Sequence, residues 1–128
     1  MTTYAQRATV DLSGANLSGA DLTLADLRFA QMMNANLTNT DLSRAKLSDA
    51  RMKNTDLAKT NLTNANLTNS DLTNANFSDA NLDRAILTGA NLTGAYLAGA
   101  DLSGADLTGV IGANFTGALN VPAKYLKD

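Results

Sequence analysis

The sequence lacks cysteine, histidine and glutamate altogether across its 128 residues. Without cysteine there can be no disulfides, thiolate nucleophiles or cysteine-ligated metals. Without histidine the chain has no side chain whose ordinary pKa lies near neutral pH, which disfavours acid–base catalysis. All twelve acidic residues are Asp. Because Asp prefers turns and caps to helix interiors, the composition also disfavours a mainly helical fold.

Aromatic residues and positive charge are scarce as well. The chain has no Trp and only three Tyr and three Phe, although 45% of its residues are hydrophobic, which predicts an aliphatic core. A net charge of −2 provides no basic surface for nucleic acid. No apolar run approaches the ~18 residues of a membrane span, and residues 1–10 do not resemble a signal peptide. We therefore expect a cytoplasmic location and neither a nucleic-acid nor a membrane partner.

A five-residue repeat dominates what is present. A large apolar residue recurs at every fifth position from Leu12 to Leu107, which makes twenty consecutive repeats. A small residue lies two positions before most of these centres, Asp or Asn usually precedes them, and Ser or Thr usually follows. The centres form the predicted structural core: Leu12, Leu17, Leu22, Leu27, Met32, Leu37, Leu42, Leu47, Met52, Leu57, Leu62, Leu67, Leu72, Phe77, Leu82, Leu87, Leu92, Leu97, Leu102 and Leu107.

A period of five fits neither a helix nor a straight strand. On a helix, successive centres would spiral around the whole surface, and on a strand they would alternate between its faces. A chain that turns a corner every five residues buries all of the centres together. Gly or Asn is frequent at the fifth position, where a type II turn requires a positive φ. We expect type II turns at the Gly corners and a different turn at Leu24, Phe29, Arg44, Lys59 and Arg84, because bulky side chains resist positive φ.

The repeat resembles that of the pentapeptide-repeat family, whose consensus is Ala-Asp/Asn-Leu-Ser/Thr-X. Residues 20–23 (Ala-Asp-Leu-Thr), 65–68 (Ala-Asn-Leu-Thr) and 100–103 (Ala-Asp-Leu-Ser) match it outright. The resemblance covers residues 10–109. It implies an all-β fold, a right-handed quadrilateral β-helix (β-solenoid) with four repeats in each coil and therefore about five coils. Residues twenty apart would then stack, which predicts two ion pairs and one like-charged pair: Asp26 with Lys46, Arg51 with Asp71, and Asp21 with Asp41.

The repeat is expected to end in boundary segments within a single domain. Residues 1–9 form an N-terminal boundary segment, in which Arg7 stands where a centre belongs. Residues 10–109 carry the twenty repeats, and residues 110–128 contain a phase break and a C-terminal cap. The next apolar centre, Phe115, follows Leu107 by eight residues, which we interpret as three extra residues in the pattern.

We expect the tail to close the open end of the stack. Asn120 is predicted to cap a short helix that has Pro122 in its first turn. Val121, Tyr125 and Leu126 are then expected to cover the last buried centres.

Two surface features are candidates for binding. Five repeats carry an apolar side chain at an outward position. Leu24, Phe29 and Met33 form a candidate interaction patch, whereas Ile86 and Tyr96 stand alone. A basic belt covers residues 44–59: Arg44, Lys46, Arg51, Lys53 and Lys59. An ordinary exposed surface is the favoured interpretation of both features.

No part of the sequence points to catalysis, a cofactor or a metal. The carboxylates are predicted to be exposed, with no pocket to raise their pKa. The Gly-rich upper repeats match no phosphate-binding motif, and the calcium-binding nonapeptide is absent. We therefore expect no catalytic, cofactor-binding or metal-ligating residues.

The leading functional interpretation is a non-catalytic scaffold that binds an unidentified protein through its outer faces. We expect a monomer, or a weak homodimer formed through one end or the apolar patch. The alternative comes from the resemblance, since some pentapeptide-repeat proteins act as DNA mimics that modulate DNA gyrase. An ice-binding surface is a weaker option, because the Thr-X-Thr pattern of such surfaces is missing.

The charge pattern predicts no effect on DNA gyrase. A DNA mimic needs a continuous negative surface, because duplex DNA carries one charge per ~1.7 Å. Here residues 41–60 carry five cations against three aspartates, and this positive belt interrupts the rod. We expect neither inhibition of supercoiling nor protection from quinolones at micromolar concentrations. Strong inhibition that is lost when Asp71, Asp79, Asp83, Asp101 and Asp106 are neutralised would instead establish mimicry.

Overall fold

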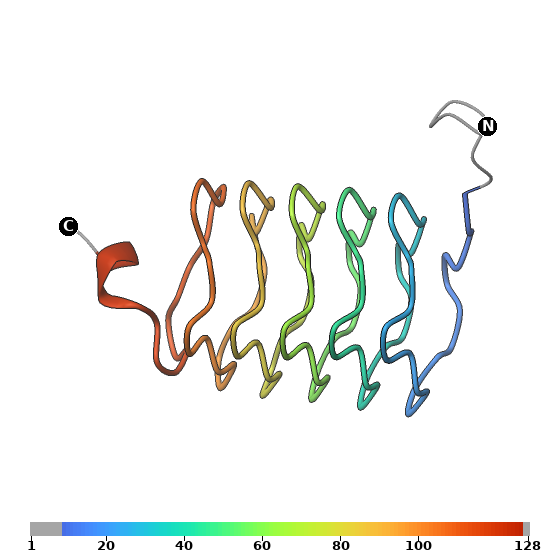
Figure 1. The fold of residues 1–128 in the computed structure, drawn as a ribbon, viewed down its shortest axis with the longest axis horizontal. Coiled ribbons are helices and arrows are strands. Elements are labelled where there is room, and N and C mark those ends of the chain that lie inside the picture. The colour runs from blue at the N-terminus through green and yellow to red at the C-terminus, as the bar shows by residue number, and fades with distance from the viewer. Residues whose placement is uncertain (1–8, 127–128) are drawn as a thin grey trace.

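The computed structural model describes residues 9–126. The chain winds into a row of similar loops stacked along one axis, and the colours run in order from one end of the stack to the other (Figure 1). The described range contains one helix, the single 3₁₀ turn η2 (Ala123–Tyr125). In the same range, strand pairing takes the form of isolated bridges rather than continuous strands. The predicted boundary segment 1–9 lies outside the described residues apart from Thr9.

Neighbouring loops are joined by parallel bridges between residues twenty apart, from Asp11 with Gln31 to Asn91 with Ile111. Each bridge residue makes two backbone hydrogen bonds to the coil before it. The N–H of Gln31 donates to the Val10 carbonyl at 2.9 Å, and the Gln31 carbonyl accepts from Leu12 at 2.7 Å. One coil therefore takes twenty residues, or four repeats. The chain is a β-helix, as the sequence predicts.

The corners between repeats share one conformation, and the expectation of two turn types was wrong. In each corner the small residue that opens a repeat donates its N–H to the previous centre, as Ala15 does to Leu12 at 3.0 Å. The fifth position has positive φ at Gly corners and at bulky ones alike, with values of 57–65° at Leu24, Phe29, Arg44, Lys59 and Arg84. Such a conformation costs a non-Gly residue roughly 1–2 kcal/mol. Ladder hydrogen bonds on both sides of each corner leave the chain no other geometry, so they impose it on any side chain.

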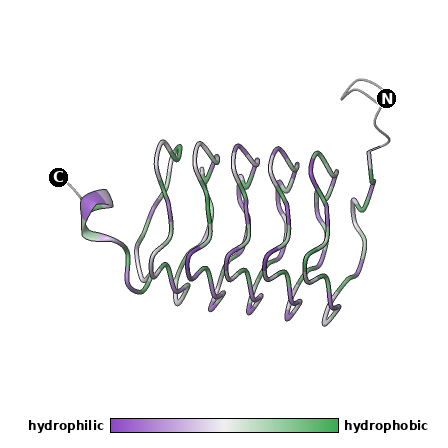
Figure 2. Ribbon diagram, viewed as in Figure 1, coloured by the Kyte–Doolittle hydropathy of each residue, from purple (hydrophilic) through white to green (hydrophobic). Residues whose placement is uncertain are grey.

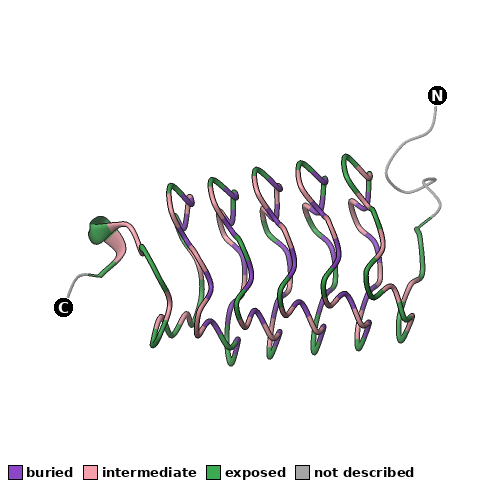
Figure 3. Ribbon diagram, turned by 90° about the horizontal axis from the view of Figure 1, so that it is seen from below, coloured by how far each residue is buried: buried purple, intermediate pink, exposed green. Residues whose placement is uncertain are grey.

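The interior of the stack is filled by the repeat centres. Every centre from Leu27 to Leu107 is buried, with no more than 7% of its surface exposed. Along the middle coils, buried stretches recur between exposed corners (Figure 3), and hydrophobic and hydrophilic stretches follow one another (Figure 2). Leu12, Leu17 and Leu22 are only half-buried, because they belong to the first coil.

Four buried hydroxyl residues replace Ala at the inward small position: Thr40, Thr55, Thr60 and Ser70. Each donates to the carbonyl of the preceding centre, as Thr40 does to Leu37 at 2.7 Å. Among the described residues, no buried side-chain nitrogen or oxygen lacks a partner. The core therefore accepts these polar groups without unpaired hydrogen-bonding atoms.

The phase break proves to be a deletion of two residues rather than an insertion of three. Ile111 still pairs with Asn91 twenty positions back, but Leu119 pairs with Asp101 only eighteen positions back. The last coil is therefore two residues short, and Phe115 packs against the core as a displaced centre. Its shortened path includes Gly112, where a Cβ atom would overlap the Thr93 hydroxyl.

The C-terminal cap differs from its prediction in two respects. Pro122, not Asn120, is the N-cap of η2. Asn120 has a φ of 57°, and its amide donates to Asp101 Oδ1 at 3.1 Å. Val121 and Tyr125 pack against the core as expected, but Leu126 is 54% exposed and does not close the end.

The filled core predicts a position-dependent cost of truncation. Leu62→Ala removes a fully buried side chain in the middle of the stack and should lower the free energy of unfolding by about 2–5 kcal/mol. Leu12→Ala should cost less, because Leu12 is already half-exposed in the first coil. Thermal and urea unfolding measure both changes. Equal losses for the two variants would contradict a stack whose first coil is weakly packed.

Candidate interaction surface

The Asp or Asn before each centre is bound within its own repeat. In most repeats its Oδ1 accepts the N–H of the residue two positions later and, where that residue is Ser or Thr, often the hydroxyl as well. Thr23 binds Asp21 in this way at 3.0 Å through nitrogen and 2.6 Å through oxygen. This is an Asx-turn, which gives a partner to a backbone N–H that the ladder does not use. These polar side chains therefore stabilise the wall and do not form a reactive cluster.

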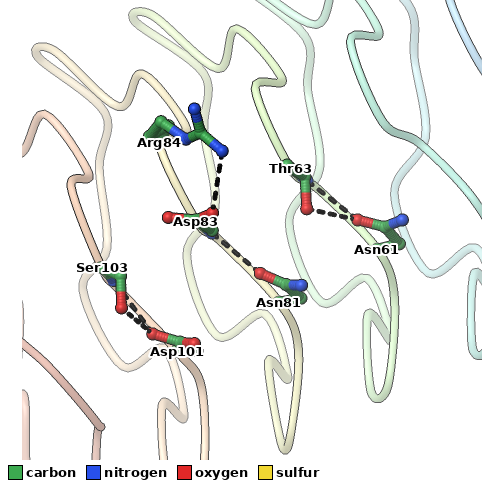
Figure 4. A network of polar contacts seen from close by, with 7 residues as sticks. All are labelled: Asn61, Thr63, Asn81, Asp83, Arg84, Asp101 and Ser103. Carbon is green, nitrogen blue, oxygen red and sulfur yellow. Dashed lines mark hydrogen bonds and ion pairs between the residues drawn. The ribbon is translucent and has the colours of Figure 1, made fainter.

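Figure 4 shows this motif on one side of three successive coils, centred on Asn61, Asn81 and Asp101. Asn61 binds Thr63, and Asp101 binds Ser103, each through the backbone and the hydroxyl. The repeat of Asn81 has Asp83 in the hydroxyl position, so only the backbone bond remains, at 2.9 Å. The spare carboxylate of Asp83 lies 3.5 Å from the Arg84 guanidinium.

The predicted ion pairs between coils do not form. Asp26 and Lys46 are bridge partners, as are Arg51 and Asp71, but neither pair is among the ion pairs of residues 9–126. Asp26 instead binds Arg28 of its own repeat through two hydrogen bonds of 2.8 and 2.7 Å. The Arg28 hydrogen bond, with a smaller contribution from the Lys46 charge, holds the pKa of Asp26 far below its ordinary value. A partner two residues along the chain is pre-positioned by the turn, which explains its preference over the next coil.

The like-charged pair of Asp21 and Asp41 is compensated locally. The two residues are bridge partners, and the charge of Asp21 raises the pKa of Asp41. The hydroxyl of Ser43, followed by its backbone N–H, outweighs this effect, so the pKa of Asp41 remains below its ordinary value. Two stacked carboxylates are therefore tolerated because each accepts hydrogen bonds from its own repeat.

The basic belt is exposed and spread around the rod. Its five cations are Arg44, Lys46, Arg51, Lys53 and Lys59, and all are exposed. They lie on all four repeats of a coil rather than on one side, and none forms an ion pair with a described residue. Such a distribution provides general surface charge and not a converging anion site.

The three residues of the predicted apolar patch differ in their exposure. Leu24 is 64% exposed, whereas Phe29 and Met33 are half-buried. Phe29 borders a cleft of about 420 Å³ together with Thr9, Gln31, Asp49 and Arg51, and this cleft includes neither Leu24 nor Met33.

A second cleft was not predicted. We define the Tyr96 side as residues 16–19, 36–39, 56–59, 76–79 and 96–99, which stack on one another. Its top opens into a cleft of about 270 Å³ lined by residues 95–98, Asn114, Thr116 and Gly117. The sequence held a signal for it, because Tyr96 and Ala98 both depart from the repeat directly below the phase break.

Residues 9–126 contain no group of three or more metal-ligating acidic, His or Cys side chains. The same range has no helix long and apolar enough to cross a membrane.

Comparison with known proteins identifies the repeat. A family profile described as pentapeptide repeats matches in eight copies, over residues 10–39, 35–74, 75–111 and 85–119. A comparison with curated protein sequences finds no match.

Three solved structures illustrate the similarity. A pentapeptide repeat protein (Rfr23) from the cyanobacterium Cyanothece 51142 is 31% identical with a TM-score of 0.69, over 85% of this chain and 90% of that one. A pentapeptide repeat protein from the thylakoid lumen of Arabidopsis thaliana is 30% identical with a TM-score of 0.52, over 89% and 70% of the two chains. A third, from Nostoc Pcc 7120, is 28% identical with a TM-score of 0.52, over 87% and 84%.

The hydrogen bonds to these carboxylates predict that the stability of the fold depends on pH. Hydrogen bonds from the same repeat lower the pKa of Asp21, Asp41, Asp101 and Asp106. Groups with a depressed pKa in the folded state contribute stability above the unfolded value of about 3.9, and this stability is lost as the pH falls through the folded values. The melting temperature should therefore be steady near neutral pH and fall below about pH 4.

Asp41→Asn provides the control for this prediction. Asn keeps the Oδ1 acceptor for Ser43 and removes the repulsion from Asp21. At neutral pH and low salt the melting temperature should be equal to or above that of the parent chain, with a smaller loss in acid. A clearly lower melting temperature at neutral pH would show that the carboxylate charge itself is required.

Proposed function

Because this chain belongs to the pentapeptide-repeat family, we propose that it is a non-catalytic scaffold that binds another protein through the outer faces of its solenoid. The observation that carries this proposal is the filled interior. Every centre from Leu27 to Leu107 is buried, so large apolar side chains occupy the interior of the coils in that range. Recognition is therefore assigned to the outside of the rod, the kind of extended surface that repeat proteins use for binding.

The outer surface suits a binding role because it can vary without affecting the core. The bridge and hydroxyl positions are occupied by side chains as different as Asp, Lys, Ile and Tyr while the ladder remains regular. The exposed belt cations and the apolar residues Leu24, Ile86 and Tyr96 are the groups that distinguish one part of this surface from another.

The proposal includes finer features that the resemblance implies. The coils wind right-handed with a square cross-section, and the protein acts in the cytoplasm. It works as a monomer, or as a weak homodimer through one end or the apolar patch. The exposed cations of residues 44–59 interrupt the negative surface that the alternative role, mimicry of DNA, would need.

Site-specific photo-crosslinking in the native host tests the scaffold. A photoreactive residue is placed at Thr73, Ser78, Asp83 or Thr88, which lie on the four successive repeats of one coil. We expect one or two adjacent sides to yield a discrete crosslinked protein, because a rod presents different side chains on each side. A Lys substitution next to the productive position should weaken the crosslink about tenfold or more, and the same change on the opposite side should not. Absence of a discrete product from all four positions would refute the proposal.

A further inference from the structure

The wall of the solenoid is open beside Tyr96, directly below the shortened last coil. Lower on the Tyr96 side, two groups of each coil bind a single residue of the next. The Ala15 carbonyl accepts from Asn36 at 2.8 Å, and the Leu17 N–H donates to the same residue at 2.8 Å. The corresponding groups of Ala75 and Phe77 bind Tyr96 in the same way, at 2.9 and 2.8 Å.

The next pair in this column has no partner. Within residues 9–126 no bridge joins Tyr96 to the last coil. Neither the Ala95 carbonyl nor the Leu97 N–H makes a hydrogen bond in that range. Asn114, which reaches this level of the stack, uses its side chain to bind Thr116 and leaves its backbone N–H and carbonyl out of the ladder.

The two-residue deletion causes this opening. The last coil is anchored on either side, where Leu92 donates to Ile111 at 2.8 Å and Gly99 donates to Gly117 at 2.9 Å. Between these anchors the chain does not follow the coil beneath it, and the cleft of about 270 Å³ results. Ala95 and Leu97 are 7% and 2% exposed, so their unpaired groups lie at the base of the cleft. A buried backbone group without a partner destabilises the fold, and a ligand that pairs it would recover that free energy.

The chemistry of the opening indicates what fits it. An acceptor and a donor that flank one residue match the N–H and carbonyl of a single residue in an extended strand. Asn36 is paired in this way at the lower end of the same column. The cleft is smaller than the ~300–1,000 Å³ of typical small-molecule sites. It therefore suits a short length of peptide backbone better than a bulky ligand.

The rim adds side-chain selectivity. At the bridge position of this side, Asn16, Asn36, Asp56 and Asn76 are followed by Tyr96, which is 59% exposed. Ala98 replaces the usual hydroxyl residue, so the rim is aromatic and apolar. The corner below carries the exposed carboxylate of Asp79, whose Oδ1 lies against Gly99. Residues 61–109 hold five aspartates against one arginine, so the surroundings are negative.

We propose that this cleft binds an extended peptide segment of a partner protein by strand addition. One residue of the segment donates its N–H to the Ala95 carbonyl and accepts from the Leu97 N–H. The side chain of that same residue is apolar and packs on Tyr96, and a Lys or Arg elsewhere in the segment faces Asp79. This mode uses backbone hydrogen bonds for affinity and alternate side chains for selectivity. The inference rests on the proposed scaffold function and names the class of partner.

Labelled peptides of the form Lys-Thr-Val-Xaa-Val-Thr-Lys, with each amino acid at Xaa, provide the probe. Fluorescence anisotropy should show saturable binding that prefers apolar Xaa. Methylation of the backbone nitrogen of Xaa removes the donor for Ala95 and should weaken binding about tenfold, as expected for one lost hydrogen bond. Amide exchange should show Leu97 unprotected in the unliganded chain, in contrast to Phe77, and protected when the peptide binds. Absence of binding across the set, or binding indifferent to methylation, would overturn the proposal.

Three variants locate the site. Tyr96→Asn should weaken binding about tenfold through loss of the ring contact. Ile86→Asn is the matched control, because Ile86 occupies the same repeat position where the ladder is complete on both sides, and its binding should be unchanged. Insertion of Leu-Thr after Ile111 restores a twenty-residue coil, and it should abolish binding while raising the melting temperature. Undiminished binding by the insertion variant would also overturn the proposal.

The outcomes separate this inference from the scaffold function. A crosslinked partner at Thr73, Asp83 or Thr88 but not at Ser78, together with no peptide binding, would leave the scaffold standing and refute the cleft. Loss of crosslinks at all four positions would refute the scaffold itself.

Discussion

Paired backbone hydrogen bonds hold each coil to the next. In each pair, one residue bonds to both neighbours of the residue twenty positions earlier: its N–H donates to the carbonyl of the preceding neighbour, and its carbonyl accepts from the N–H of the following neighbour. Asn36 binds Ala15 and Leu17 in this way. The pattern continues along the stack up to Ile111, which pairs with Asn91. The rest of the structure depends on this ladder. Because neighbouring strands lie about 4.8 Å apart, it sets the spacing at which the leucine centres stack into a filled core. It also requires every complete coil to have the same length.

The ladder explains why every corner has a positive φ, whichever side chain stands there. A residue such as Lys59 or Arg84 takes a positive φ that would be unfavourable in isolation, because the bonded segments on both sides determine where the corner must run. The Asx-turns then give partners to N–H groups that the ladder leaves over, using atoms from the same repeat. Within the complete coils, backbone and core are thus satisfied internally. The remaining outward positions can change from coil to coil without loss of the fold, which is the property that a binding scaffold requires.

The same constraint marks the place where the fold is imperfect. A coil two residues too short cannot align every residue with the coil beneath it, so some ladder groups must remain unpaired. The shortage lies between Ile111 and Leu119, and the bonds on either side keep the last coil attached. The tail beyond it turns through η2 and packs Val121 and Tyr125 against the core. An interrupted wall beside Tyr96 differs physically from the outer faces elsewhere, because it offers unpaired backbone groups and not side chains alone.

The sequence by itself determined the repeat and its family, and its composition excluded histidine and cysteine chemistry. It also determined the inward centres, because a period of five allows only one way to bury the leucines together. It did not determine the conformation of the bulky corners, the partner of Asp26, or the sense of the phase break. Corner preferences and stacked charges are weak local effects, and the ladder or a nearer partner within the repeat overrides them. Whether eight residues between Leu107 and Phe115 mean three extra or two missing depends on which coil Phe115 joins. Only the tertiary structure decides that, since the answer lies in hydrogen bonds to residues eighteen to twenty positions away.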